Sequence, residues 1–145
     1  MSKLSSEQAV TIQQQSSNSV IVDSQELALQ IADAADDKKA QDIVLLKVTD
    51  ISYLADYFVI VTGFSRTQLK AIAESIEEKI EEKYNLVPVR VSGKRDGDWI
   101  VQDYADVIVH TFLPEEREYY NFEAFWGHAE RIEYSPDSSQ TSVYE

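Results

Sequence analysis

Residues 99–126 read WIVQDYADVIVHTFLPEEREYYNFEAFW, and they carry the strongest structural signals in the chain. It contains both tryptophans of the chain and two apolar runs, 99–104 and 106–112, that have the composition of strands. Only the short junction at Ala105 separates the runs, so they are expected to pair as a hairpin. Pro114, followed by two glutamates, is typical of a helix N-terminus. The stretch therefore predicts two antiparallel strands followed by an aromatic helix.

Upstream residues predict the rest of an α/β fold. Residues 43–46 and 56–62 are nearly continuous apolar runs, typical of strands that are covered on both faces. A further strand is expected over 87–91, where Pro88 favours an edge position or a strand start.

Two helices are predicted by their N-terminal residues. Asp23 with Glu26, and Ser65 with Gln68, have the spacing of a capping box, in which each side chain bonds a backbone N–H near the helix start. The resulting order of elements predicts an α/β fold with a mixed five-stranded sheet and helices packed on it.

The chain divides into one domain and two tails. Residues 1–22 are rich in Ser and Gln and are expected to form a flexible N-terminal tail, and residues 135–145 a flexible C-terminal tail. Residues 23–134 are expected to form the folded domain.

Composition excludes several classes of function. The chain has 145 residues and a net charge of −13, from 26 acidic and 13 basic side chains, so little direct contact with a nucleic-acid backbone is expected. Such a charge is typical of a solvated acidic surface or of a basic protein partner. There is no cysteine, which excludes disulfides and thiolate metal sites. No apolar segment is long enough to span a membrane or to act as a signal peptide, and we expect a cytoplasmic protein.

Acidic side chains are the first candidates for catalysis. Asp96, Asp98, Asp103 and Asp106 could hold Mg²⁺ near Ser65, as in metal-dependent nucleotidyltransferases. However, those enzymes have adjacent Gly and Ser, which Phe64 separates here. The first aspartate pair also lies in a turn, where Asp is common for its own hydrogen bonding. We therefore predict no catalytic residue, no metal and no cofactor.

The two histidines do not indicate a site either. His110 lies in an apolar run, and His128 has no metal-ligand spacing to it. We expect His110 to be a core or groove residue.

Aromatic residues are the stronger signal. Tyr119 and Tyr120 are adjacent in the predicted helical segment, as are Phe125 and Trp126. Adjacent helical residues cannot face the same way, so part of this aromatic surface is expected to be exposed. Aromatic residues among charges are typical of a protein–protein contact.

Taken as an ordered set, these motifs resemble the Iojap-like ribosomal silencing factors, the RsfS family. The resemblance covers roughly residues 27–130. Its motifs are DI (42–43), DYFVI (56–60), GFSRTQ (63–68), WIVQDY (99–104), DVIVH (106–110), REYY (117–120), FE (122–123) and Trp126. The chain differs from the family at Ala105, where the family usually has Gly, and at Phe122, where it usually has Leu. Since Gly permits positive φ and Ala disfavours it, the hairpin is expected to differ slightly in geometry.

The resemblance implies a nucleotidyltransferase-like topology without transferase activity. It also implies that the protein binds the large ribosomal subunit through ribosomal protein L-fourteen, sterically blocks joining of the small subunit, and represses translation under nutrient limitation. The predicted contact region, with aromatic anchors and acidic side chains that face a basic partner, comprises Tyr57, Trp99, Asp103, Tyr104, Asp106, Tyr119, Tyr120 and Trp126.

Three alternatives stay open at the level of sequence. One is the metal-dependent nucleotidyltransferase-like enzyme, and another is an acidic adaptor for a basic protein outside the ribosome. Aromatic surface that no partner covers could also pair two copies into a homodimer.

Overall fold

The computed structural model describes residues 22–136 and 142–143. The predicted N-terminal tail lies outside these residues except for Val22, which packs against the core. The elements are α2 (Ser24–Asp36), β1 (Gln41–Lys47), β2 (Tyr57–Thr62), α3 (Arg66–Tyr84), β3 (Arg90–Ser92), β4 (Trp99–Asp103), β5 (Val107–Phe112), α4 (Pro114–Tyr120), α5 (Phe122–Phe125), β6 (Glu130–Glu133) and β7 (Ser142–Val143).

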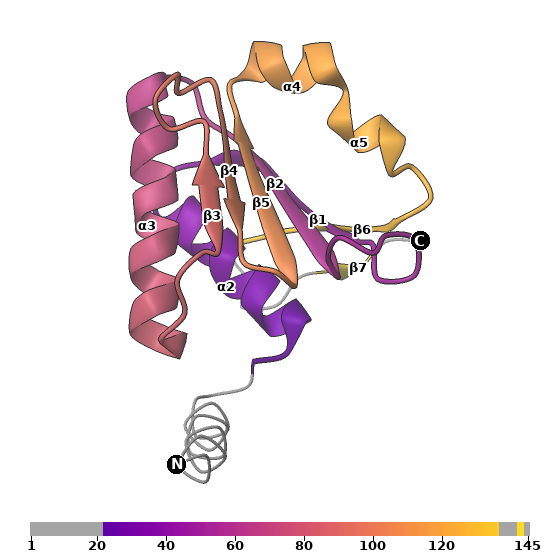
Figure 1. Ribbon diagram of the computed structural model, residues 1–145. Coiled ribbons are helices and arrows are strands. Elements are labelled where there is room, and N and C mark those ends of the chain that lie inside the picture. Colours follow the sequence, from indigo (N-terminus) through magenta and orange to yellow (C-terminus); the bar gives the residue numbers. More distant parts are fainter. Residues whose placement is uncertain (1–21, 137–141, 144–145) are drawn as a thin grey trace, which may run out of the picture.

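The elements form three layers around one mixed sheet. Helices α2 and α3 pack on one face of the sheet, and α4 and α5 arch over the other (Figure 1). Side chains alternate along β2, so that Val59 faces α2 and α3 whereas Phe58 and Ile60 face the opposite layer. The predicted α/β class is confirmed.

Within the described residues the sheet has seven strands, in the order β3-β4-β5-β2-β1-β6-β7. The central pair β2–β5 is parallel and the other pairs are antiparallel. The expected count of five is therefore too low, because β6 and β7 add to the edge beside β1. Strand β7 falls inside the segment that was expected to be a tail, and the rest of that segment beyond Pro136 lies outside the described residues.

Both predicted helix starts are confirmed. The side chain of Asp23 accepts from the N–H groups of the next turn, and Ser65 Oγ accepts from Gln68 N at 3.0 Å. Gln68 Oε1 in turn accepts from Phe64 N, one residue before the cap. Helix α3 ends at Tyr84 and is capped by Asn85, which adopts the left-handed conformation with φ 58°.

Two boundaries differ from the prediction. Strand β3 begins at Arg90, three residues after the expected start, because Pro88 has no N–H for a ladder. The single helical segment expected after Pro114 is two short helices, α4 and α5, joined at Asn121 in the left-handed conformation with φ 48°.

The predicted hairpin of β4 and β5 is confirmed, and Ala105 forms its turn with φ 74°. Asp106 N donates to Tyr104 O at 2.9 Å across this residue, which closes a three-residue γ-turn. The backbone therefore keeps a conformation that suits Gly, although the side chain is that of Ala.

Candidate functional site

The sheet face opposite α2 and α3 carries a cluster of rings from three adjacent strands. Trp99 comes from β4, His110 and Phe112 from β5, and Phe58 from β2. Ring centroids lie 4.6 Å apart for Trp99 and Phe112, and 5.7 Å apart for Phe58 and His110. Because strand side chains alternate, every second residue of these strands contributes to one continuous aromatic face.

Residues 114–126, which we call the arm, cover part of this face with α4 and α5 (Figure 1). Phe122 lies 4.2 Å from His110, and Trp126 lies 4.9 Å from Phe58, measured between ring centroids. Phe122 and Trp126 therefore attach the C-terminal half of the arm to the sheet.

The outer side of the arm presents aromatic rings to solvent. Tyr119 and Phe125 are 81% and 78% exposed, whereas Tyr120 is 47% exposed and its ring lies 4.9 Å from that of Trp99. The expectation that part of the aromatic surface is exposed is confirmed, and Phe125 faces solvent whereas Trp126 packs on Phe58. The rings of Tyr119 and Tyr120, however, contact each other edge to face, with centroids 5.0 Å apart. Phe125 was not among the predicted contact residues, although the same adjacency argument could have found it.

His110 is a buried residue of this face, as expected. Its Nδ1 accepts from Trp99 Nε1 at 3.1 Å. Burial lowers the pKa of His110 to about 4, so the imidazole is neutral at pH 7.

Two of the four aspartates considered for catalysis have structural partners. Asp98 Oδ1 accepts from Arg66 Nε at 2.6 Å, and Asp103 Oδ1 accepts from Ala105 N at 2.8 Å in the hairpin turn. Among residues 22–136 and 142–143, no three His, Asp or Glu side chains gather in a way that could hold a metal ion.

The structure divides the eight predicted contact residues between two faces. Tyr57 and Tyr104 point toward α2 and α3 and are only 4% and 6% exposed, so they offer a partner almost no area. Asp106 is exposed at the hairpin turn. The other five lie on the aromatic face or on the arm above it: Trp99, Asp103, Tyr119, Tyr120 and Trp126.

A groove of about 270 Å³ opens beside the arm on the same face. Its apolar walls include Leu54, Ile108 and Trp126, and Arg90 and Asp103 supply polar atoms to its lining. Leu54 is 66% exposed. Sequence reasoning missed Leu54 and Arg90, because neither belongs to a motif and only the fold brings them to the groove.

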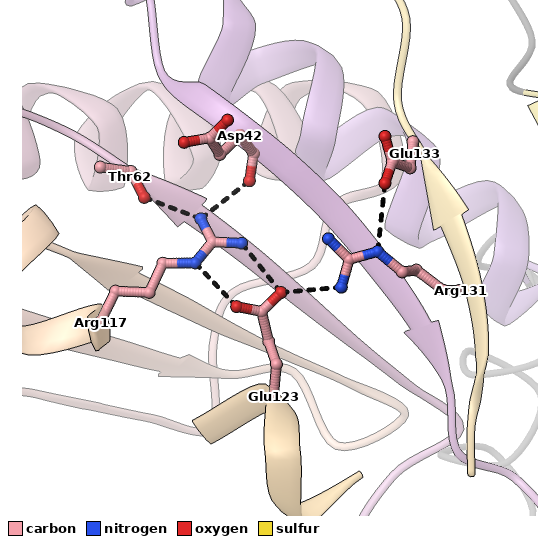
Figure 2. A network of polar contacts seen from close by, with 6 residues as sticks. All are labelled: Asp42, Thr62, Arg117, Glu123, Arg131 and Glu133. Carbon is pink, nitrogen blue, oxygen red and sulfur yellow. Dashed lines mark hydrogen bonds and ion pairs between the residues drawn. The ribbon is translucent and has the colours of Figure 1, made fainter. Parts of the chain in front are cut away.

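A polar network fastens the arm to the sheet (Figure 2). Arg117 Nε and Nη2 donate to the two carboxylate oxygens of Glu123 at 3.0 and 3.1 Å. Arg117 Nη1 donates to the Asp42 carbonyl at 2.8 Å and to Thr62 Oγ1 at 2.7 Å. Arg131 Nη1 donates to Glu123 at 3.0 Å from β6.

Opposing effects act on Glu123. Burial raises the pKa of its carboxyl, but the hydrogen bonds and charges of Arg117 and Arg131 outweigh burial and leave this pKa below its ordinary value. Glu123 is therefore ionised at neutral pH, and its paired arginines compensate the buried charge.

No helix in the described part of the chain is long and apolar enough to cross a membrane.

The candidate site consists of an aromatic face, an exposed arm and a neighbouring groove, on a chain of strongly negative charge.

Comparison with known proteins identifies a family. Residues 21–144 match the family model described as "Ribosomal silencing factor during starvation". The ribosomal silencing factor RsfS of Bacillus subtilis is 42% identical over 106 residues, which cover 72% of this chain and 89% of that protein. A mouse protein named "Mitochondrial assembly of ribosomal large subunit protein 1" is 33% identical over 91 residues, 61% of this chain and 40% of that one.

The fold has solved counterparts too. A crystal structure of a Chromobacterium violaceum protein superposes with a TM-score of 0.71 at 35% identity, covering 73% of this chain and 88% of that one. Ribosomal silencing factors are regulatory proteins rather than enzymes, in agreement with the non-enzymatic prediction. The motifs, the fold and these matches together show that the chain belongs to the RsfS family of ribosomal silencing factors.

Proposed function

We propose that this protein binds the large ribosomal subunit through ribosomal protein L-fourteen and thereby blocks joining of the small subunit, which represses translation when nutrients are limiting. Family membership and the name of the mouse relative support a large-subunit partner. The observation that carries the proposal is the arm, which exposes Tyr119 and Phe125 on an acidic chain.

An exposed aromatic pair is suited to a protein partner. Large rings contribute most of the binding energy in many interfaces, and monomeric proteins rarely expose several together. On the arm, Tyr119 and Tyr120 of the predicted contact region, together with Phe125, are the rings that a partner would cover, and the ring of Trp99 packs beneath that of Tyr120.

Charge favours a basic partner. A net charge of −13 steers the protein toward positive surfaces and away from bare phosphate. Asp103 and Asp106, at the end of β4 and in the hairpin turn, are the carboxylates that would face basic side chains of L-fourteen. Asp103 lines the groove beside Trp126, and β5 places Asp106 roughly 20 Å from the start of the arm at Pro114, a span that one interface of ordinary size covers.

Silencing by this route requires no catalysed reaction. A protein that occupies the joining face of the large subunit prevents assembly by occupancy alone, so affinity and position determine its effect. We place this activity in the cytoplasm, where bacterial ribosomes assemble.

Co-sedimentation tests the proposal. The purified chain is mixed with isolated large subunits, small subunits or free L-fourteen, and joining of the two subunits is followed by light scattering. We expect binding to large subunits and to L-fourteen, no binding to small subunits, and joining that slows as the protein saturates the large subunit. Failure to bind large subunits contradicts the proposal, and tight binding to an unrelated basic protein instead supports the adaptor alternative.

A further inference from the structure

We propose that Arg117 is the positioning residue of the arm, in that its guanidinium sets the angle at which α4 presents Tyr119 and Tyr120 to the partner. The inference rests on the proposed function, because it concerns how the same surface recognises its partner. It assigns that role to a side chain which does not itself touch the partner, since Arg117 is only 12% exposed.

Arg117 first fixes the angle within the arm. It lies on α4, and its bidentate partner Glu123 lies on α5, so the pair spans the joint at Asn121. Asn121, with φ 48°, is the single residue between the two helices. The angle between α4 and α5 therefore depends on the side-chain contacts that join them. Two parallel hydrogen bonds define both a distance and a plane, which one ammonium group cannot do.

Arg117 also fixes the arm to the sheet. Its Nη1 reaches Thr62 Oγ1 at the end of β2 and the carbonyl of Asp42 in β1. Asp42 has φ 50° beside a register shift between Gln41 and Val44, which identifies a β-bulge. One guanidinium therefore joins α4, α5, β1 and β2 (Figure 2).

Apolar packing does not duplicate this function. Neither α4 nor α5 has a fully buried residue. The rings that attach the arm to the core, Phe122 and Trp126, both lie after the Asn121 joint. Before that joint, Leu113 at the N-cap holds the start of α4 against the core. Further along α4, Arg117 bonds to the sheet and the ring of Tyr120 contacts that of Trp99.

Two variants separate position from stability. Arg117→Met leaves the half-buried Glu123 with only Arg131 as its partner, so it should lower both stability and affinity. The double variant Arg117→Met/Glu123→Met removes both charges and should recover most of the stability, but not the bonds that set the angle. Ile80→Val in the core under α3 is the matched control, because it lowers stability without touching the arm.

Arm position can be measured directly because the chain has no cysteine. Cysteines are introduced at two exposed positions, Glu118 on α4 and Glu74 on α3, and each is given a spin label. Pulsed electron paramagnetic resonance then measures the distance between the two labels. We expect one narrow distance distribution in the otherwise unchanged chain and in Ile80→Val. We expect a broadened or displaced distribution in both Arg117 variants.

Binding to large subunits is measured on the same set without labels. We expect affinity at least tenfold weaker for both Arg117 variants and unchanged for Ile80→Val. If the double variant binds as tightly as the unchanged chain, or keeps its narrow distance, the inference is wrong. Affinity that merely follows stability across all three variants also overturns it. The distance measurement needs no partner, so it decides on the arm even if the chain proves not to bind ribosomes.

Discussion

The indole N–H of Trp99 donates to Nδ1 of His110 across neighbouring strands, at 3.1 Å. This bond requires an unprotonated Nδ1, so it holds only while the imidazole is neutral. Burial enforces the same state by lowering the pKa of His110 to about 4. The aromatic face therefore contains one group whose protonation opposes folding.

Acid is expected to destabilise the protein through His110. In the unfolded chain the imidazole of His110 has its ordinary pKa near 6.5, whereas in the folded chain its pKa is about 4. The contribution of His110 to the free energy of unfolding is therefore fully present above pH 6.5 and is lost as the pH falls toward 4. The shift corresponds to about 3 kcal/mol of unfolding free energy. Urea unfolding at several pH values measures this loss.

His110→Gln isolates that contribution, because the amide oxygen can accept from Trp99 but does not titrate in this range. Carboxylates such as Glu123 also contribute to acid sensitivity, yet they do so equally in both chains. A variant that loses as much stability as the unchanged chain between pH 6.5 and 4 would show that His110 is not responsible.

Ala105→Gly is expected to stabilise the protein by about 1 kcal/mol. Ala105 has φ 74°, a conformation that costs an L-residue with a Cβ about 1–2 kcal/mol, partly offset by the greater chain entropy of Gly in the unfolded state. Thermal unfolding checks the sign.

Ala71→Gly in α3 is the control for that substitution. The same change in a helix is expected to destabilise by about 1 kcal/mol, since no positive φ is relieved there. Equal effects at the two positions would mean that the turn is not strained.

Removing the exposed rings of the arm should weaken binding without unfolding the protein. We expect Tyr119→Ala/Phe125→Ala to reduce affinity for large subunits about tenfold or more, because aromatic anchors at interfaces contribute about 1–2 kcal/mol or more each. The stability change should stay within about 0.5 kcal/mol, since the rings are largely exposed.

Val87→Ala serves as the control, since this side chain is 61% exposed and lies between α3 and β3, outside the arm. A loss of affinity in Val87→Ala as large as that caused by either arm substitution would argue against the arm as the contact.

Salt should slow the association of the protein with large subunits more than it speeds their dissociation. The charge of −13 acts at long range, and ions screen it beyond about 10 Å at 0.1 M salt. Stopped-flow measurements between about 0.05 M and 0.5 M salt should show an association rate constant that falls by about tenfold or more. A rate independent of salt would contradict electrostatic steering toward a basic surface.

Local signals in the sequence predicted much of the fold. The capping residues Asp23 and Ser65 determine helix starts through bonds to residues two or three positions away, so the sequence is enough to find them. Strand β6 was missed for the opposite reason. Within residues 130–133 only Ile132 is apolar and buried, so no alternation marks the strand, and its pairing with β1 spans more than eighty residues of chain.

The candidate site was predictable in part. Adjacency alone indicated that part of the aromatic surface around Tyr119 and Tyr120 is exposed. Tyr57, by contrast, begins a strand buried on both faces, whose continuous apolar run gives no sign of which side chains point to which layer. The partners of Arg117 are equally hidden, because Asp42 and Thr62 reach it only through the tertiary fold.

The order of strands also determines when the protein can finish folding on the ribosome that synthesises it. The parallel neighbour of β2 is β5, some fifty residues later, and β1 gains its second neighbour only with β6 at residues 130–133. Contacts of such sequence separation form late and slowly. The sheet therefore stays incomplete until β6 has left the exit tunnel, and the surface that we propose as the contact cannot form before β5 and the arm have followed β2 out of it.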